Sequence, residues 1–147
     1  YPNVKIVFDQ TANWQREQAM SLVENLLTSG TQIHAILCQN DGMALGVVEA
    51  VKAAGLADKV AVFGTDGISD AYASIKAGEL TGTVDSFPVL TGEVAMETAL
   101  RLVSGQALPR VVSTPQALIT KDNVARYQDA GDNLRAVLIE DEKKWVS

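Results

Sequence analysis

Four polar residues follow or close apolar runs of this sequence, at points where buried strands would end. They are Asn40, Asp66, Asp85 and Ser86. In an open α/β sheet the ligand binds beyond the carboxyl ends of the strands, so side chains at these positions are candidates for ligand contact. Amide, carboxylate and hydroxyl groups supply the hydrogen-bond donors and acceptors that a polyhydroxylated molecule needs. These residue types therefore favour recognition of a sugar or polyol.

Asn13 and Trp14 follow the first predicted strand and add an amide and an aromatic ring. The ring of Trp14 offers an apolar plane for the C–H face of a sugar. A second interpretation stays open, because Asn40, Asp41 and Asp66 are also residue types that cap helices and form turns. Trp14 fits equally well at the core edge of its own helix. Spacing alone does not separate the two interpretations.

Other kinds of site find little support in the sequence. His34 and Cys38 are the one histidine and the one cysteine, and on a strand they lie ~13 Å apart, too far to share a metal ion. Neither the G-x-S-x-G motif of a serine nucleophile nor a phosphate-binding glycine motif occurs. We expect no metal, no cofactor and no catalytic residue, and we expect Cys38 to be a small core side chain.

Composition bounds the classes of protein and partner. A chain of 147 residues corresponds to one domain. The net charge of −6 argues against nucleic acid as a partner, since phosphate binding needs a basic face. The chain opens on Tyr1, directly before a predicted strand, which is typical of a processed product or of a cut inside a longer protein.

Strand and helix patterns alternate along the chain and predict an α/β fold with a three-layer parallel sheet of about five strands, as in flavodoxin-like proteins. We expect Asn13 to cap the first helix and Asp41 to cap the second. The predicted strands are residues 4–8, 35–39, 60–63 and 80–85, with short extended pieces at 111–112 and 116–120. The main predicted helices are residues 14–29, 42–54, 69–77 and 89–104.

Three sequence blocks together resemble a known family. They are QNDGMALG at 39–46, FGTDG at 63–67 and IKAGEL at 75–80. In combination they are similar to the sugar-type periplasmic binding proteins of ABC importers, the ribose-binding-protein-like members of periplasmic binding protein type I. The same fold serves as the sensor domain of LacI-type repressors. The resemblance covers residues 4–130.

The resemblance implies which part of the fold is present. The family has two α/β lobes with the sugar closed between them, and this chain resembles only the second lobe. Residues 1–130 would form that lobe, residues 88–114 would pack on the missing first lobe in an intact protein, and residues 131–147 would form a C-terminal tail.

The resemblance also assigns roles to the candidate residues. Asn40 and Asp66 would hydrogen-bond the ligand and Trp14 would stack on it, beside Asn13. Ser86, preceded by Asp85, stands where the family often has glutamine, and this departure leaves the ligand's identity open.

The implied function is that of a solute-binding protein, not an enzyme, which captures a sugar or polyol and presents it to ABC permease subunits. It would work in the periplasm or another extracytoplasmic compartment, with a signal peptide upstream of this chain. The alternative is the ligand-sensing domain of a LacI-type transcription regulator. An enzyme of flavodoxin-like or response-regulator type is a weaker hypothesis, because no second acid adjoins Asp9. A single lobe offers half of the ligand contacts, so we expect weak or no measurable binding by this chain.

The helix at residues 88–104 carries an apolar stripe that needs a partner. It either folds back on the sheet or pairs with a second copy, which would give a homodimer through this helix.

Overall fold

The computed structural model describes residues 2–145, and side chains up to residue 141. Its helices are α1 (Arg16–Thr28), α2 (Asp41–Ala53), α3 (Ser69–Ala77), α4 (Pro88–Val103), α5 (Val124–Gln128) and α6 (Leu134–Trp145). Its strands are β1 (Ala35–Leu37), β2 (Ala61–Asp66), β3 (Gly82–Asp85) and β4 (Ala117–Thr120). A short 3-10 turn, Gly131–Asn133, precedes α6. The alternation of helix and strand confirms the α/β class.

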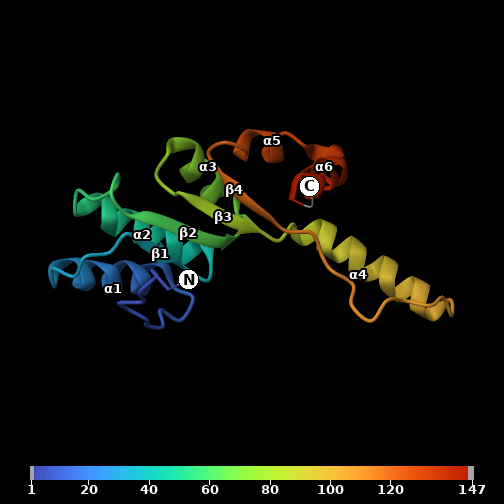
Figure 1. The fold of residues 1–147 in the computed structure, drawn as a ribbon, viewed down its shortest axis with the longest axis horizontal. Helices are drawn as coiled ribbons and strands as arrows, with labels where there is room; N and C mark the ends of the chain where they lie inside the picture. The colour runs from blue at the N-terminus through green and yellow to red at the C-terminus, as the bar shows by residue number, and fades with distance from the viewer. Residues whose placement is uncertain (1, 146–147) are drawn as a thin grey trace.

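The four strands of the described chain form one sheet in the order β1-β2-β3-β4 (Figure 1). β1, β2 and β3 are parallel, whereas β4 runs antiparallel to β3, with Ala117 opposite Asp85. The described residues thus form four of the about five strands predicted, and the last of them is antiparallel where a parallel strand was expected. β4 begins beside the end of β3, so the chain returns without the crossover that a parallel neighbour requires.

Residues 4–8 do not form the predicted first strand. They belong to none of the strands of the sheet, and their apolar side chains are exposed, Ile6 to 81%. β1 is an edge strand of the sheet that the described residues form. A strand needs a neighbouring strand for its backbone hydrogen bonds. Residues 4–8 have the composition of a strand, but no neighbouring strand pairs with them in the described chain.

One face of the sheet carries the core. Val62, Thr83 and Ile119 point to this face and are almost completely buried. Leu37 and Leu118 point to the other face and are 75% and 48% exposed. Helices α2 and α3 contact the buried face, so the described residues form two layers and the predicted third layer is not among them.

α2 lies at the centre of this core and α1 packs beside it. α2 buries the apolar side chains Met43, Ala44, Leu45, Val47, Val48, Ala50 and Val51. A Cβ atom at Gly46 would collide with the carbonyl oxygen of Arg16, so glycine permits the close approach of the two helices.

α4 and the stretch that returns from it project from the core as an arm (Figure 1). Leu90, near the base of the arm, is the one residue of α4 that is buried. The helix therefore does not fold back on the sheet, which excludes the first of the two expected outcomes in the described chain. α6 packs near the base of the arm, where Arg135 donates to Glu93 at 3.0 Å, and Arg126 of α5 pairs with Glu140 and Asp141 of α6.

Candidate functional site

The start of α2 brings two candidate segments together. Asn40 is the N-cap of α2, and its Oδ1 accepts from the amide of Met43 at 2.8 Å. Its Nδ2 donates to the carbonyl oxygen of Trp14 at 3.3 Å. The amide of Asn40 thus joins the start of α2 to the turn before α1, and the half-buried side chain retains a second lone pair and a second N–H.

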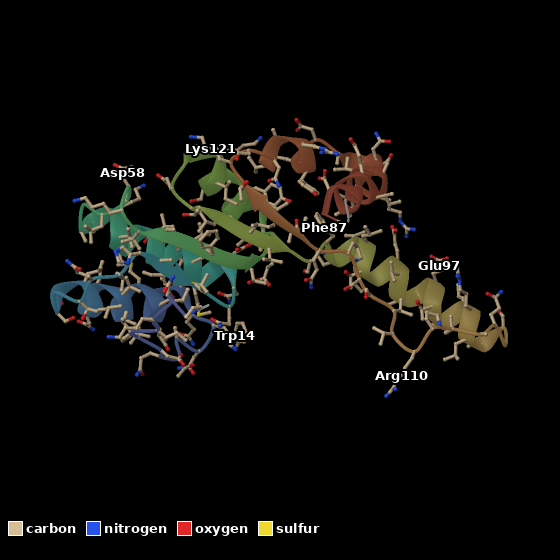
Figure 2. All side chains as sticks on the ribbon, in the orientation of Figure 1. Trp14, Asp58, Phe87, Glu97, Arg110 and Lys121 are labelled. Atoms are coloured by element: carbon tan, nitrogen blue, oxygen red, sulfur yellow. The ribbon has the colours of Figure 1, made fainter. Side chains whose placement is uncertain are left out.

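Asn13 and Trp14 form a turn in which both residues have positive φ, 49° and 63°. Asn13 donates to Gln18 at 2.9 Å, while the N-cap of α1 is Gln15 without a side-chain hydrogen bond, so the prediction that Asn13 caps this helix is wrong. The indole of Trp14 is 66% exposed, and Figure 2 shows it at the periphery of the core. Trp14 is therefore not a core residue, and its exposed ring is available to a ligand near the start of α2.

Asp66 is the last residue of β2 and is exposed. Its φ of 124° lies in a region that residues with a side chain rarely adopt. In the sheet it stands next to Asp85, the last residue of β3. Both carboxylates therefore lie at the edge of the sheet formed by the carboxyl ends of the parallel strands.

Asp85 is buried and its carboxylate is engaged within the protein. Tyr72 donates its hydroxyl to Oδ2 at 2.8 Å and the amide of Phe87 donates to Oδ1 at 2.7 Å. Burial raises the pKa of Asp85, and these two hydrogen bonds oppose the rise. Burial and the neighbouring carboxylate also raise the pKa of Tyr72. Ser86, the next residue, is half-buried and its carbonyl oxygen accepts from Thr91 at 2.8 Å.

Asp41 is a functional candidate that sequence reasoning placed in the wrong role. It is the first residue of α2, not its cap, and its side chain is completely buried. One oxygen accepts from the hydroxyl of Thr83 at 2.6 Å, and the other accepts from the amides of Gly67 and Ile68 at 2.8 and 2.9 Å. Burial raises the pKa of Asp41, and the three hydrogen bonds oppose the rise.

No local signal could have identified these partners of Asp41, because they lie 26, 27 and 42 residues away in the sequence. The sequence offers two adjacent residue types that cap helices, and only the packed structure selects Asn40 for that position.

The geometry suits hydrogen bonding to a small polar molecule on an open edge. Asn40, Asp66 and the Trp14 ring are accessible there, whereas Asp85 is turned inward. Surface hollows occur elsewhere, one against α1 with Glu17 and Gln18 in its lining and one between α4 and α6. Among the described residues, no group of three or more His, Cys, Asp or Glu side chains is arranged to hold a metal ion. Within the same part of the chain, no helix has the length and apolarity needed to cross a membrane.

Comparison with known proteins identifies relatives of this chain. The family described as periplasmic binding protein domain matches residues 1–107. A putative rhizopine-binding protein of Rhizobium meliloti is 41% identical over 126 residues, which are 85% of this chain and 41% of the relative. The D-allose-binding periplasmic protein of Escherichia coli is 39% identical over 72% of this chain and 34% of its own length.

Solved structures that resemble this chain are also binding proteins for small solutes. A periplasmic solute-binding protein of an ABC transporter from Actinobacillus succinogenes, with bound D-allose, has a TM-score of 0.78 and 40% identity over 86% of this chain and 45% of that one. The Caulobacter myo-inositol-binding protein, bound to myo-inositol, has a TM-score of 0.74 and 43% identity over 89% of this chain and 45% of that one. The chain thus spans less than half the length of these relatives.

Proposed function

Because the chain belongs to the periplasmic binding protein domain family, a family of binding proteins, we propose that it is part of a solute-binding protein that captures a sugar or polyol for an ABC importer. The observation that carries this proposal is that Trp14, Asn40 and Asp66 lie on segments that hydrogen bonds join: Asn40 donates to the carbonyl oxygen of Trp14, and Asp41 accepts from the amides that follow Asp66. Relatives whose names specify rhizopine, allose or myo-inositol support the substrate class.

Each candidate residue has a proposed role. Asn40 and Asp66 hydrogen-bond hydroxyl groups of the ligand, Trp14 stacks on its C–H face, and Asn13 extends the polar rim. Ser86 contributes a short hydroxyl. Asp85 contacts the ligand only through a lone pair that Tyr72 and Phe87 leave free. Its main effect is to hold the amide of Phe87 and thereby fix the backbone that follows Ser86.

We propose that residues 1–130 belong to the second lobe of a two-lobe protein and that residues 88–114 pack on the first lobe when it is present. The arm formed by α4 supports this arrangement, because most of its large apolar side chains are exposed in the described chain and Leu90 alone is buried. The C-terminal segment 131–147 accompanies the second lobe through the ion pairs of Arg126.

The intact protein would work outside the cytoplasm, with a signal peptide upstream, and deliver its ligand to the permease subunits of the importer. A LacI-type regulator is not favoured, because the relatives named above are binding proteins, one of them a solute-binding protein of an ABC transporter.

The ligand proposal is tested by titrating ¹⁵N-labelled protein with D-allose, D-ribose and myo-inositol and following the backbone amides by NMR. A single lobe lacks half of the contacts, so we expect dissociation constants of about 1 mM or weaker, equivalent to about 4 kcal/mol of binding free energy or less. Shifts should cluster around Trp14, Asn40 and Asp66.

Asp66→Asn should weaken this binding, whereas Asp58→Asn, at the far end of the core in Figure 2, should not. Micromolar binding, or shifts that avoid this edge, would contradict the half-site proposal.

The unpartnered side of α4 has a separate test. Val89, Met96, Leu100 and Val103 recur at helical spacing and form one exposed stripe. In the absence of the first lobe we propose that this stripe joins two copies of the chain. Leu100→Glu should shift the mass measured by light scattering from dimer to monomer. Leu102→Glu is the matched control, because Leu102 is similarly exposed, 65% against 61%, but lies on the opposite side of the helix. A wild-type monomer, or equal effects of both variants, would refute a dimer through this stripe.

A further inference from the structure

Asp66 owes its backbone conformation to the loop that follows it. A φ of 124° at a residue with a side chain persists only where the surroundings determine it. The next two residues, Gly67 and Ile68, both donate their amides to the same oxygen of Asp41. These two hydrogen bonds fix the chain immediately after Asp66.

Asp41 is itself fixed from several directions. It lies in the first turn of α2 and is completely buried, and the hydroxyl of Thr83 in β3 holds its other oxygen at 2.6 Å. A Cβ atom at Gly64 of β2 would collide with its carboxylate. One side chain therefore connects α2, β2, β3 and the loop at the carboxyl end of β2.

We propose that Asp41 is a positioning residue for the ligand site: without touching the ligand, it holds Asp66 in the conformation that presents the Asp66 carboxylate to a sugar or polyol. The part of this inference that concerns ligand affinity rests on the proposed function. The part that concerns the loop after Asp66 does not. It assigns to the buried carboxylate a role in ligand affinity that is separate from its role in the core.

Two substitutions at Asp41 separate these roles by their hydrogen-bond chemistry. In Asp41→Asn the amide oxygen accepts from Gly67 and Ile68 while the NH₂ group donates to the hydroxyl of Thr83, which can also accept. In Asp41→Leu no acceptor remains for the two backbone amides. The asparagine variant should therefore preserve the loop and the leucine variant should release it.

A destabilised control excludes a general loss of stability. Val47→Ala creates a cavity at a 1% exposed position of the same helix, with no hydrogen bond to the loop. All variants are compared with the wild type by ¹⁵N NMR, first for the shifts and hydrogen exchange of residues 66–68 and then for the affinity for D-allose and myo-inositol.

We expect Asp41→Leu to shift the signals of residues 66–68, to accelerate exchange of the Gly67 and Ile68 amides, and to weaken binding about tenfold or more, because two charge-assisted hydrogen bonds are lost. Asp41→Asn and Val47→Ala should retain the loop signals and most of the affinity. If Asp41→Leu does not fold, Thr83→Val takes its place, since it removes the hydrogen bond that holds the other oxygen of Asp41 and should give the same changes in weaker form.

Unchanged loop signals in Asp41→Leu or its substitute overturn the inference, and so does an affinity loss that Val47→Ala shares. If the wild-type chain binds none of the probes, the proposed ligand contacts of the isolated lobe fail, whereas its proposed place in a two-lobe binding protein does not depend on them. The exchange of the Gly67 and Ile68 amides still decides whether Asp41 fixes the loop.

Discussion

Replacing Gly67 by alanine should destabilise the protein by about 3–5 kcal/mol. The φ of Gly67 is +82°, where a side chain costs about 1–2 kcal/mol. The added Cβ atom would lie 2.5 Å from Oδ1 of Asp85 and closer still to its Cγ and Oδ2. The buried carboxylate has to move, and it then loses at least one of its hydrogen bonds to Tyr72 and Phe87, at about 1.5–3 kcal/mol each.

The assay is urea unfolding followed by circular dichroism, with Gly30→Ala as the matched control. Gly30 has nearly the same φ, +76°, but nothing lies within 4 Å of its added Cβ atom. Gly30→Ala should lower the free energy of unfolding only by the cost of a side chain at positive φ, about 1–2 kcal/mol. The difference of about 2 kcal/mol or more corresponds to roughly 4–8 °C in Tm for a chain of this size.

A double-mutant cycle shows whether the Asp85 carboxylate is the cause. In the Asp85→Ala background the obstacle is gone, so Gly67→Ala should cost no more there than Gly30→Ala does in the wild type. Equal costs of Gly67→Ala in both backgrounds, or a cost in the wild type no greater than that of Gly30→Ala, would refute the reasoning.

Three further predictions follow from the packing and from the pKa shifts. Burial raises the pKa of Cys38 to about 11 from 9.0, which lowers the fraction of reactive thiolate. At pH 8 its reaction with a disulfide reagent should therefore be about a hundredfold slower in the folded protein than in urea. Equal rates would contradict this prediction. Gly46→Ala should destabilise the protein by about 1–3 kcal/mol, because the added Cβ atom meets Arg16. The control Gly92→Ala, whose Cβ atom meets nothing within 4 Å, should stabilise the protein by up to about 1 kcal/mol in the same urea assay. Equal losses of stability in the two variants would show that contact with Arg16 is not the cause. Burial raises the pKa of Asp41 above 3.8, so the folded state binds the proton of this carboxyl group more tightly than the unfolded state does. The unfolding free energy of the wild type relative to that of Asp41→Asn should therefore fall as the pH rises from about 4 to 7. A difference that rises over this range would show that the pKa is shifted in the opposite direction.

The sequence predicted the central elements well because their signals are local. Helical spacing of apolar residues and the glycines that follow each helix located α1, α2 and α3 to within two residues at most ends. The apolar runs located β1, β2 and β3. In each case the residues that specify the element lie within it or one to two residues beyond its end.

The failures have a common physical cause, which is dependence on distant partners. Residues 4–8 have the composition of a strand, but pairing depends on a neighbour that the described chain does not supply. The direction of β4 depends on the path of the arm. The distinction between Asn40 as cap and Asp41 as core carboxylate depends on Thr83, Gly67 and Ile68. Likewise, the sequence places Asp85 at the end of a strand but does not show that the hydroxyl of Tyr72 donates to its carboxylate.

Backbone strain in the described residues is concentrated near the candidate site. The non-glycine residues with positive φ are Asn13, Trp14, Asp66 and Phe87. Three of them are candidate ligand residues, and the fourth follows Ser86 and begins the arm.

Each of these strained segments is restrained by a hydrogen bond. Asn40 holds the carbonyl of Trp14, Asp41 holds the amides after Asp66, and Asp85 holds the amide of Phe87. Strain that persists through such restraints is expected where a site is organised before its ligand arrives, because side chains that are already fixed lose less entropy on binding. The same restraint at Phe87 ties the start of the arm to β3, the strand next to Asp66, so movement of the arm against the proposed first lobe would act directly on the edge that holds the candidate ligand residues.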